Sequence, residues 1–154
     1  MIGSDPSWLK DLAARGDVEI VYAVHPNPNV DGPVRAALAG ASHITLTPPL
    51  DYLPLVHLMK HARLILTDSG GIQEEAPAFG IPTLVLREVT ERPEGVESGS
   101  LKLVGTDRKR IVAEANQLLD DPTAYAKMSK ATNPYGDGHA AEKIVSALLA
   151  FQVQ

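Results

Sequence analysis

A serine, two glycines and two carboxylates stand close together in the stretch DSGGIQEEAPAFGIPTLVL, residues 68–86. The turn at Ser69-Gly70-Gly71 follows an apolar segment and opens a predicted helix, whose first N–H groups have no partner within the helix. Glycines let an anion approach the backbone closely, and the serine adds a hydroxyl. Glu75 lies one helical turn further on, where its carboxylate can accept hydrogen bonds from a vicinal diol. This pattern predicts phosphate at the turn and ribose at Glu75, the two halves of a nucleotide.

The same stretch also has a purely structural interpretation. Gly70 and Gly71 would then form only a tight turn, and Glu74 and Glu75 would be solvated residues in a first turn that the helix dipole favours. The stretch lacks the Gly-Lys-Ser/Thr ending of a Walker loop and the third glycine of the dinucleotide fingerprint. The residue pattern alone leaves both interpretations open.

Two further candidates follow other predicted strands. Arg92, in TERPEG (90–95), lies in the polar connection 87–100, where it could neutralise a diphosphate or hold a sugar. His25 ends a strand and could donate a hydrogen bond or titrate near neutral pH. The alternatives are a surface arginine in a polar loop and a histidine that fixes the turn before Pro26.

No metal site or cofactor is predicted. The sequence has no cysteine, and its five histidines show no HExxH spacing. His57 and His61 are four residues apart on a predicted helix but lack a third ligand nearby in the sequence. We expect both to be surface histidines.

The elements that must position these residues alternate along the chain. Apolar, β-branched runs predict strands at 18–24, 43–47, 63–67, 82–87 and 101–105. Apolar periodicity predicts helices at 29–40, 51–62 and 71–80, with later helices starting near Asp107, at Asp121-Pro122 and near Gly138. Strands that are continuously apolar and separated by helices indicate a parallel sheet covered on both faces, so the predicted fold is doubly wound α/β. Ligands of such sheets bind beyond the carboxyl ends of the strands.

Composition sets the broad class. The chain has 154 residues and a net charge of −5, which suits one domain and argues against nucleic acid as the main partner. No apolar run approaches the roughly 20 residues that span a bilayer, so a cytoplasmic protein without a membrane partner is expected. Residues 1–7 look like a tag-like leader joined part-way along a helix, with the domain occupying 8–154. A native short N-terminal helix is the alternative.

Three segments together carry a family resemblance: VYAVHPNPNV, LILTDSGGIQEEAPAFGIPTLVLREVTERPEGVESGSLKLVGTD and NPYGDGHAAEKI. They resemble the C-terminal domain of the non-hydrolysing UDP-N-acetylglucosamine 2-epimerases, from about Trp8 onward. The resemblance implies a Rossmann-like domain, one half of a GT-B-type enzyme with its active site between two domains.

The resemblance also implies an activity. These isomerases interconvert UDP-GlcNAc and UDP-ManNAc for cell-envelope polysaccharide synthesis, by elimination and re-addition of UDP, without a metal or other cofactor. UDP and the UDP-N-acetylhexosamine are then the small-molecule partners, and the full-length enzyme is expected to be a homodimer. The residues that match the family's motifs are Ser69, Gly70 and Gly71 for the diphosphate, Glu75 for the ribose, Arg92 for the nucleotide-sugar, Leu55 for the uracil pocket and His25 for a second, activating UDP-GlcNAc.

Two departures from the family pattern limit the expectation. The family often has an aromatic residue where Leu55 stands, so no stacking on uracil is expected there. The family's acid/base carboxylates and its HRxEN-type motif belong to sequence that precedes the VHPN strand, so no catalytic residue is expected in this chain. Without the N-terminal domain the chain is expected to be inactive alone. Half of a GT-B glycosyltransferase, a hydrolysing epimerase and a stand-alone nucleotide-sugar-binding module remain as alternatives.

Overall fold

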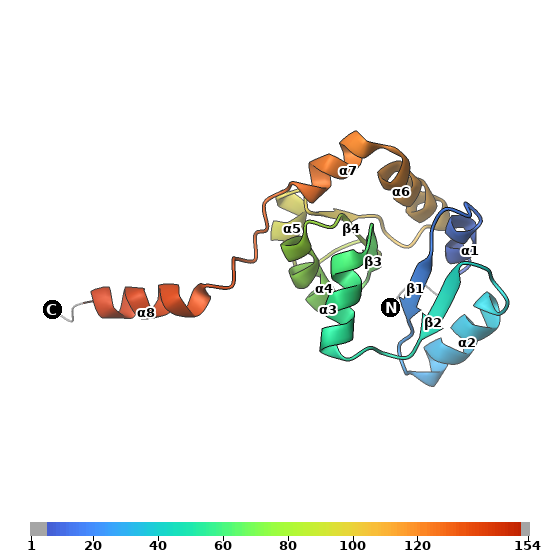
Figure 1. Cartoon of the computed structure of the whole chain (residues 1–154), viewed down its shortest axis with the longest axis horizontal. Coiled ribbons are helices and arrows are strands. Elements are labelled where there is room, and N and C mark those ends of the chain that lie inside the picture. Colours follow the sequence, from blue (N-terminus) through green and yellow to red (C-terminus); the bar gives the residue numbers. More distant parts are fainter. Residues whose placement is uncertain (1–5, 152–154) are drawn as a thin grey trace.

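The computed structural model describes residues 6–151, in which strands and helices alternate (Figure 1). Residues 1–5 of the predicted leader lie outside this range. The strands are β1 (Ile20–Ala23), β2 (Ile44–Thr47), β3 (Ile65–Thr67), β4 (Thr83–Val85) and β5 (Leu101–Leu103). The helices are α1 (Trp8–Ala13), α2 (Pro28–Leu38), α3 (Tyr52–His61), α4 (Gly70–Glu75), the 3-10 helix η1 (Ala76–Phe79), α5 (Pro93–Glu97), α6 (Arg108–Asp120), α7 (Pro122–Ser129) and α8 (Ala140–Ala150).

The strands form two parallel sheets. β1 pairs with β2, with Ile20 opposite Ile44, and β4 lies between β3 and β5. The predicted α/β fold with parallel strands is therefore confirmed. The predicted single sheet is instead divided, because β1 and β3 are not hydrogen-bonded neighbours.

One apolar core joins the two sheets. Leu84 in β4 is completely buried, and β4 and the residues after it pack with α6 and α1. Val24, at the end of β1, belongs to the same cluster. The other members that are buried here include Trp8, Leu9, Leu12, Val34, Leu38, Leu86, Val104, Ile111, Ala115 and Leu118. Val24 of the β1 end and Leu84 of β4 thus share one core, against which Leu66 of β3 also packs.

Local signals set several helix ends as predicted. Asp107 caps α6, where its carboxylate accepts a hydrogen bond from the Arg110 N–H at 2.8 Å. Gly80 has φ +63°, the left-handed conformation that ends a helix at low cost for glycine. The predicted helix 71–80 is divided by Pro77, which has no N–H to donate, into α4 and the tighter η1.

Other expectations were wrong in detail. The polar connection 87–100 contains a helix that was not predicted, α5, which begins at Pro93. In the predicted helix 51–62, which is α3 here, the Tyr52 side chain is 64% exposed, and Met59 is the buried residue. The C-terminal helix has the predicted apolar period, yet Ile144, Val145, Leu148 and Leu149 are all exposed.

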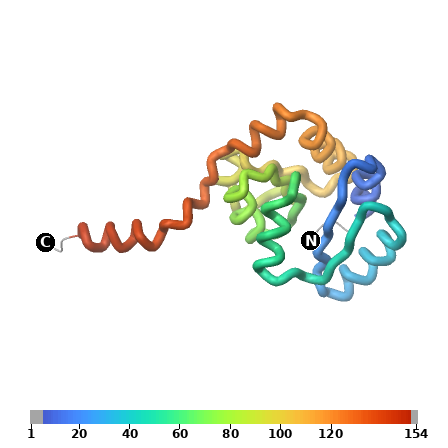
Figure 2. The backbone as a smooth tube through the Cα atoms, in the orientation of Figure 1, coloured from blue at the N-terminus to red at the C-terminus, as the bar shows by residue number. Residues whose placement is uncertain are grey.

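Helix α8 projects away from the body at the end of an extended connection (Figures 1 and 2). It has 11 residues, and its apolar side chains bury against nothing in the described chain. No helix within residues 6–151 has the length and apolar character needed to cross a bilayer. The body of the domain, and not α8, therefore holds the functional residues considered below.

The cap of α7 gives a first test of this architecture. The Asp121 carboxylate accepts hydrogen bonds from the N–H groups of Thr123 and Ala124, at 2.8 and 3.2 Å. We expect Asp121→Ala to lower the free energy of unfolding by about 1 kcal/mol, measured by urea denaturation. Asp51 is the matched control, because it precedes α3 without a side-chain capping bond. Equal losses in Asp121→Ala and Asp51→Ala would contradict the capping role.

Candidate functional site

The turn after β3 leaves open space above its glycines. Ser69 precedes α4, and its N–H donates to the Thr67 hydroxyl at 3.0 Å. Neither Gly70 nor Gly71 has a positive φ, so neither is required by the backbone conformation. A Cβ on Gly70 would meet nothing within 4 Å, and one on Gly71 only the Ser69 hydroxyl at 3.9 Å. Packing does not require the glycines either, which favours a ligand interpretation over a tight turn.

The two adjacent carboxylates have different surroundings. Glu74 is 45% exposed and forms an ion pair with Arg92. Glu75 lies partly buried at the end of α4, and its Oε2 atom is buried with no hydrogen-bond partner among residues 6–151. Buried carboxylate oxygens are costly when unpaired, and native structures retain few of them. Glu75 thus keeps one carboxylate oxygen whose hydrogen-bonding capacity is not used within the described residues.

A chain of hydrogen bonds through the buried Gln73 connects the Ser69 turn to the loop that carries Arg92. Gln73 is completely buried; its amide donates to the Ser69 carbonyl at 3.2 Å, and its carbonyl accepts from the Thr90 hydroxyl. Thr90 in turn accepts from the Arg92 N–H at 3.0 Å. Roles for Gln73 and Thr90 were not predicted from the sequence. The available signal was that both are uncharged polar residues inside the two quoted motifs.

Arg92 reaches the site from the second loop. Its guanidinium Nε donates to Glu74, which raises the pKa of Arg92 above its usual value. A further nitrogen donates to the Glu91 carbonyl at 3.0 Å, and the side chain is 35% exposed. The structure therefore brings Arg92 beside α4. Glu74 holds the cation in place while leaving it accessible to an anion.

His25, Leu55 and Ser69 line one large groove, whose volume is about 1240 Å³. His25 is exposed, and its Nδ1 accepts from the Asn27 N–H at 3.2 Å, which agrees with the turn-fixing alternative. Leu55 is partly buried on α3. Gly70, Gly71, Glu75 and Arg92 are not among the residues that line this groove. The predicted residues thus form two adjoining groups that share Ser69.

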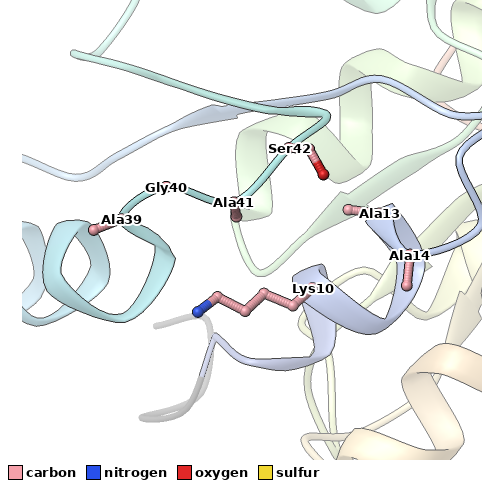
Figure 3. Close-up of a pocket in the computed structure, with 7 residues that line it drawn as sticks. All are labelled: Lys10, Ala13, Ala14, Ala39, Gly40, Ala41 and Ser42. Atoms are coloured by element: carbon pink, nitrogen blue, oxygen red, sulfur yellow. The ribbon is translucent and has the colours of Figure 1, made fainter.

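Two other features of the described chain are weaker candidates for a functional site. His57 and His61 stack with ring centroids 4.3 Å apart, but no group of three or more potential metal ligands occurs among residues 6–151. A shallow hollow of about 310 Å³ lies between α1 and the segment before β2 (Figure 3). Its one charged side chain is Lys10, and it contains none of the predicted site residues.

Comparison with solved structures places this geometry in context. The domain superposes on UDP-GlcNAc 2-epimerase from Neisseria meningitidis bound to UDP-GlcNAc with a TM-score of 0.88 and 43% identity, covering 96% of this chain and 41% of that one. It superposes on S. aureus MnaA in a UDP co-structure with a TM-score of 0.86 and 46% identity, covering 92% and 39%. A glycotransferase of kitacinnamycin, 17% identical with a TM-score of 0.65, shares the fold.

Sequence comparison agrees. The chain is 57% identical over 148 residues to the UDP-N-acetylglucosamine 2-epimerase of Yersinia pestis, covering 96% of this chain and 39% of that protein. The chain thus spans about two fifths of the length of the relatives it matches. The model of the family described as UDP-N-acetylglucosamine 2-epimerase matches residues 6–149. The chain belongs to the UDP-N-acetylglucosamine 2-epimerase family.

Proposed function

We propose that this chain is the UDP-binding part of a UDP-N-acetylglucosamine 2-epimerase. The diphosphate lies on the Ser69-Gly70-Gly71 turn, and the ribose hydroxyls donate to Glu75. The observation that carries the proposal is the buried, unpartnered Glu75 Oε2, one helical turn from backbone that is open to an anion. Relatives crystallised with UDP or UDP-GlcNAc support it.

Each residue has a distinct role in handling UDP as a leaving group. Elimination places new negative charge on the diphosphate, and fixed donors aimed at that charge stabilise the transition state. Ser69 and the N–H groups of the turn supply uncharged donors, and Arg92 supplies a cation. Leu55 lies against the uracil, and His25 contacts a second nucleotide-sugar. The proton-transfer groups are supplied by another part of the enzyme, so the chain alone binds UDP without turning over UDP-GlcNAc.

Calorimetric titration with UDP tests the binding proposal. We expect saturable binding with a dissociation constant below about 1 mM, equivalent to roughly 4 kcal/mol. Uridine and pyrophosphate, titrated separately, should each bind more weakly than UDP, because each occupies only one half of the site. Absence of any heat of binding at millimolar UDP would refute the proposal for this chain.

Gly71 allows a test that separates binding from folding. Since a Cβ at Gly71 meets only the Ser69 hydroxyl at 3.9 Å, Gly71→Ala should leave the unfolding free energy equal or slightly higher. The methyl group would occupy the space above the backbone N–H groups, so we expect UDP affinity to fall about tenfold, or 1.4 kcal/mol.

Gly32→Ala is the matched control for Gly71→Ala. Gly32 lies in helix α2, also has open space at its Cβ position, and is outside the site. This variant should gain stability in the same way and keep wild-type UDP affinity. Unchanged UDP affinity in Gly71→Ala would show that the diphosphate does not bind at this turn.

A further inference from the structure

The loop that carries Arg92 is in contact with a segment much later in the sequence. Residues 130–139 connect α7 to α8, and this connection leaves the body of the domain beside α5 (Figure 1). The Tyr135 hydroxyl donates to the Arg92 carbonyl at 3.5 Å, although the two residues are 43 positions apart in the sequence. Tyr135 belongs to the segment NPYGDG, for which no role was predicted from the sequence.

A local turn fixes the backbone that carries Tyr135. The side-chain amide of Asn133 donates to the Gly136 carbonyl at 2.9 Å, and its side-chain carbonyl accepts from the Tyr135 N–H at 3.0 Å. Gly136 has φ +105°, a conformation that glycine adopts without the steric cost that other residues have. The asparagine side chain therefore holds the backbone on both sides of Tyr135, whose ring is partly buried.

The Tyr135 hydroxyl lies at the start of α5 and takes the place of a cap. Arg92 is the N-cap residue of α5, yet its side chain makes no capping hydrogen bond. The first N–H groups of a helix have no partner within the helix, so they need one from outside. Burial raises the pKa of Tyr135, and a hydrogen bond from the Gly95 backbone works against that rise. The hydroxyl thus accepts from the first turn of α5 while it donates to Arg92.

Gly95 leaves the space that the Tyr135 hydroxyl occupies. Gly95 is buried, and its φ is not positive, so the backbone conformation does not require a glycine. A Cβ at this position would lie 2.6 Å from the Tyr135 hydroxyl oxygen and 2.4 Å from Cδ1 of Leu101. Both distances are shorter than a carbon atom tolerates, so the glycine is needed for the close approach of these two side chains.

Arg92 is therefore held at both of its backbone polar groups. Its N–H donates to the Thr90 hydroxyl at 3.0 Å, and its carbonyl accepts from Tyr135. The guanidinium stays beside Glu74 on α4 only while the backbone that carries it stays in place. We propose that Tyr135 is a positioning residue for Arg92, which it holds where the guanidinium meets the diphosphate. This inference rests on the proposed role of Arg92 in binding UDP.

A double-mutant cycle separates positioning of Arg92 from simple packing of the connection. Tyr135→Phe keeps the ring and removes the hydroxyl. We expect it to lower UDP affinity about fivefold in calorimetry, and to have no further effect in an Arg92→Ala background, because the group that it positions is then absent. An equal loss of affinity in both backgrounds overturns the proposal, and so does wild-type UDP affinity in Tyr135→Phe. Tyr125→Phe is the matched control, since this partly buried ring packs against Arg63, outside the site, and should keep wild-type affinity.

Hydrogen exchange in the unliganded chain tests the positioning without UDP. The Nε–H of Arg92 donates to Glu74, so its exchange rate, measured by NMR, reports how firmly the guanidinium is held. We expect this rate to rise about tenfold in Tyr135→Phe and to stay at the wild-type value in Tyr125→Phe. An unchanged rate in a folded Tyr135→Phe variant overturns the proposal, even where UDP binds. Wild-type UDP affinity in Arg92→Ala, or no UDP binding by the wild-type chain, would instead contradict the proposed function, and the exchange rate would then decide whether Tyr135 positions Arg92.

Discussion

Replacing Glu75 by alanine should lower UDP affinity by one to two orders of magnitude while leaving the fold intact. Hydrogen bonds to a charged group contribute about 1.5–3 kcal/mol each, and Glu75 is proposed to accept from the ribose hydroxyls. The unliganded chain loses no hydrogen bond to Oε2 in Glu75→Ala, because that buried atom has no partner in the described part of the chain. Stability should therefore change little or rise, since the unpaired oxygen is removed. Calorimetry with UDP and urea denaturation measure the two effects.

The neighbouring Glu74 supplies the control, with an expected effect of opposite sign. Glu74 is exposed and paired with Arg92, so Glu74→Ala frees the guanidinium and removes a negative charge close to the anion. UDP affinity should be unchanged or increased. General electrostatics would raise affinity in both variants, so a loss confined to Glu75→Ala identifies a specific contact. Equal UDP affinities in Glu75→Ala and Glu74→Ala would show that the ribose does not contact Glu75.

This divergence shows where sequence reasoning about the site was limited. The motif indicated that both carboxylates lie near the turn, because helical spacing is a local property. The motif favoured Glu75 as the ribose ligand but did not predict the ion pair of Glu74, because that pair depends on Arg92, which is 18 residues later in the sequence than Glu74. Similarly, the sequence suggested a role for the glycines but left a tight turn as the alternative. Only the backbone angles and the open space around Gly70 and Gly71 favour one interpretation.

In the fold, too, local features were predicted and contacts between distant parts of the sequence were not. Caps and stops such as Asp107, Asp121 and Gly80 were predicted correctly, because their signals act over a few residues. The alternation of strands and helices predicted parallel pairing, which the structure confirms. The separation of β1 from β3 was not predicted. Each strand reads as apolar and buried in the sequence, and nothing within a strand specifies which strand lies beside it.

Substitution of Gln73 should have the second large effect, because it should lower both the unfolding free energy and the UDP affinity. Its side chain is completely buried, and both polar ends are bonded, to the Ser69 carbonyl and the Thr90 hydroxyl. Gln73→Met keeps a long, unbranched shape and leaves the partly buried Thr90 hydroxyl without its acceptor. Each buried group left unpaired costs about 1–3 kcal/mol, so we expect a loss of about 2–3 kcal/mol in urea denaturation. Gln117→Met, at an exposed position on α6, should change stability by less than about 0.5 kcal/mol.

The binding measurement distinguishes a positioning role for Gln73 from a structural one. Gln73 connects the turn that carries Ser69 to the loop that carries Arg92, so its loss should let these two groups move independently. Under conditions where Gln73→Met is fully folded, UDP affinity should still fall about tenfold, because the donors would no longer be held at a fixed separation. Thr90→Val should show the same loss and Thr90→Ser should retain wild-type affinity, since only the hydroxyl completes the chain of hydrogen bonds. A destabilised Gln73→Met variant with wild-type UDP affinity would make Gln73 a core residue alone. A loss of UDP affinity in both Gln73→Met and Thr90→Val would show that the turn with Ser69 and the loop with Arg92 act as one binding surface, because the buried Gln73 amide joins them.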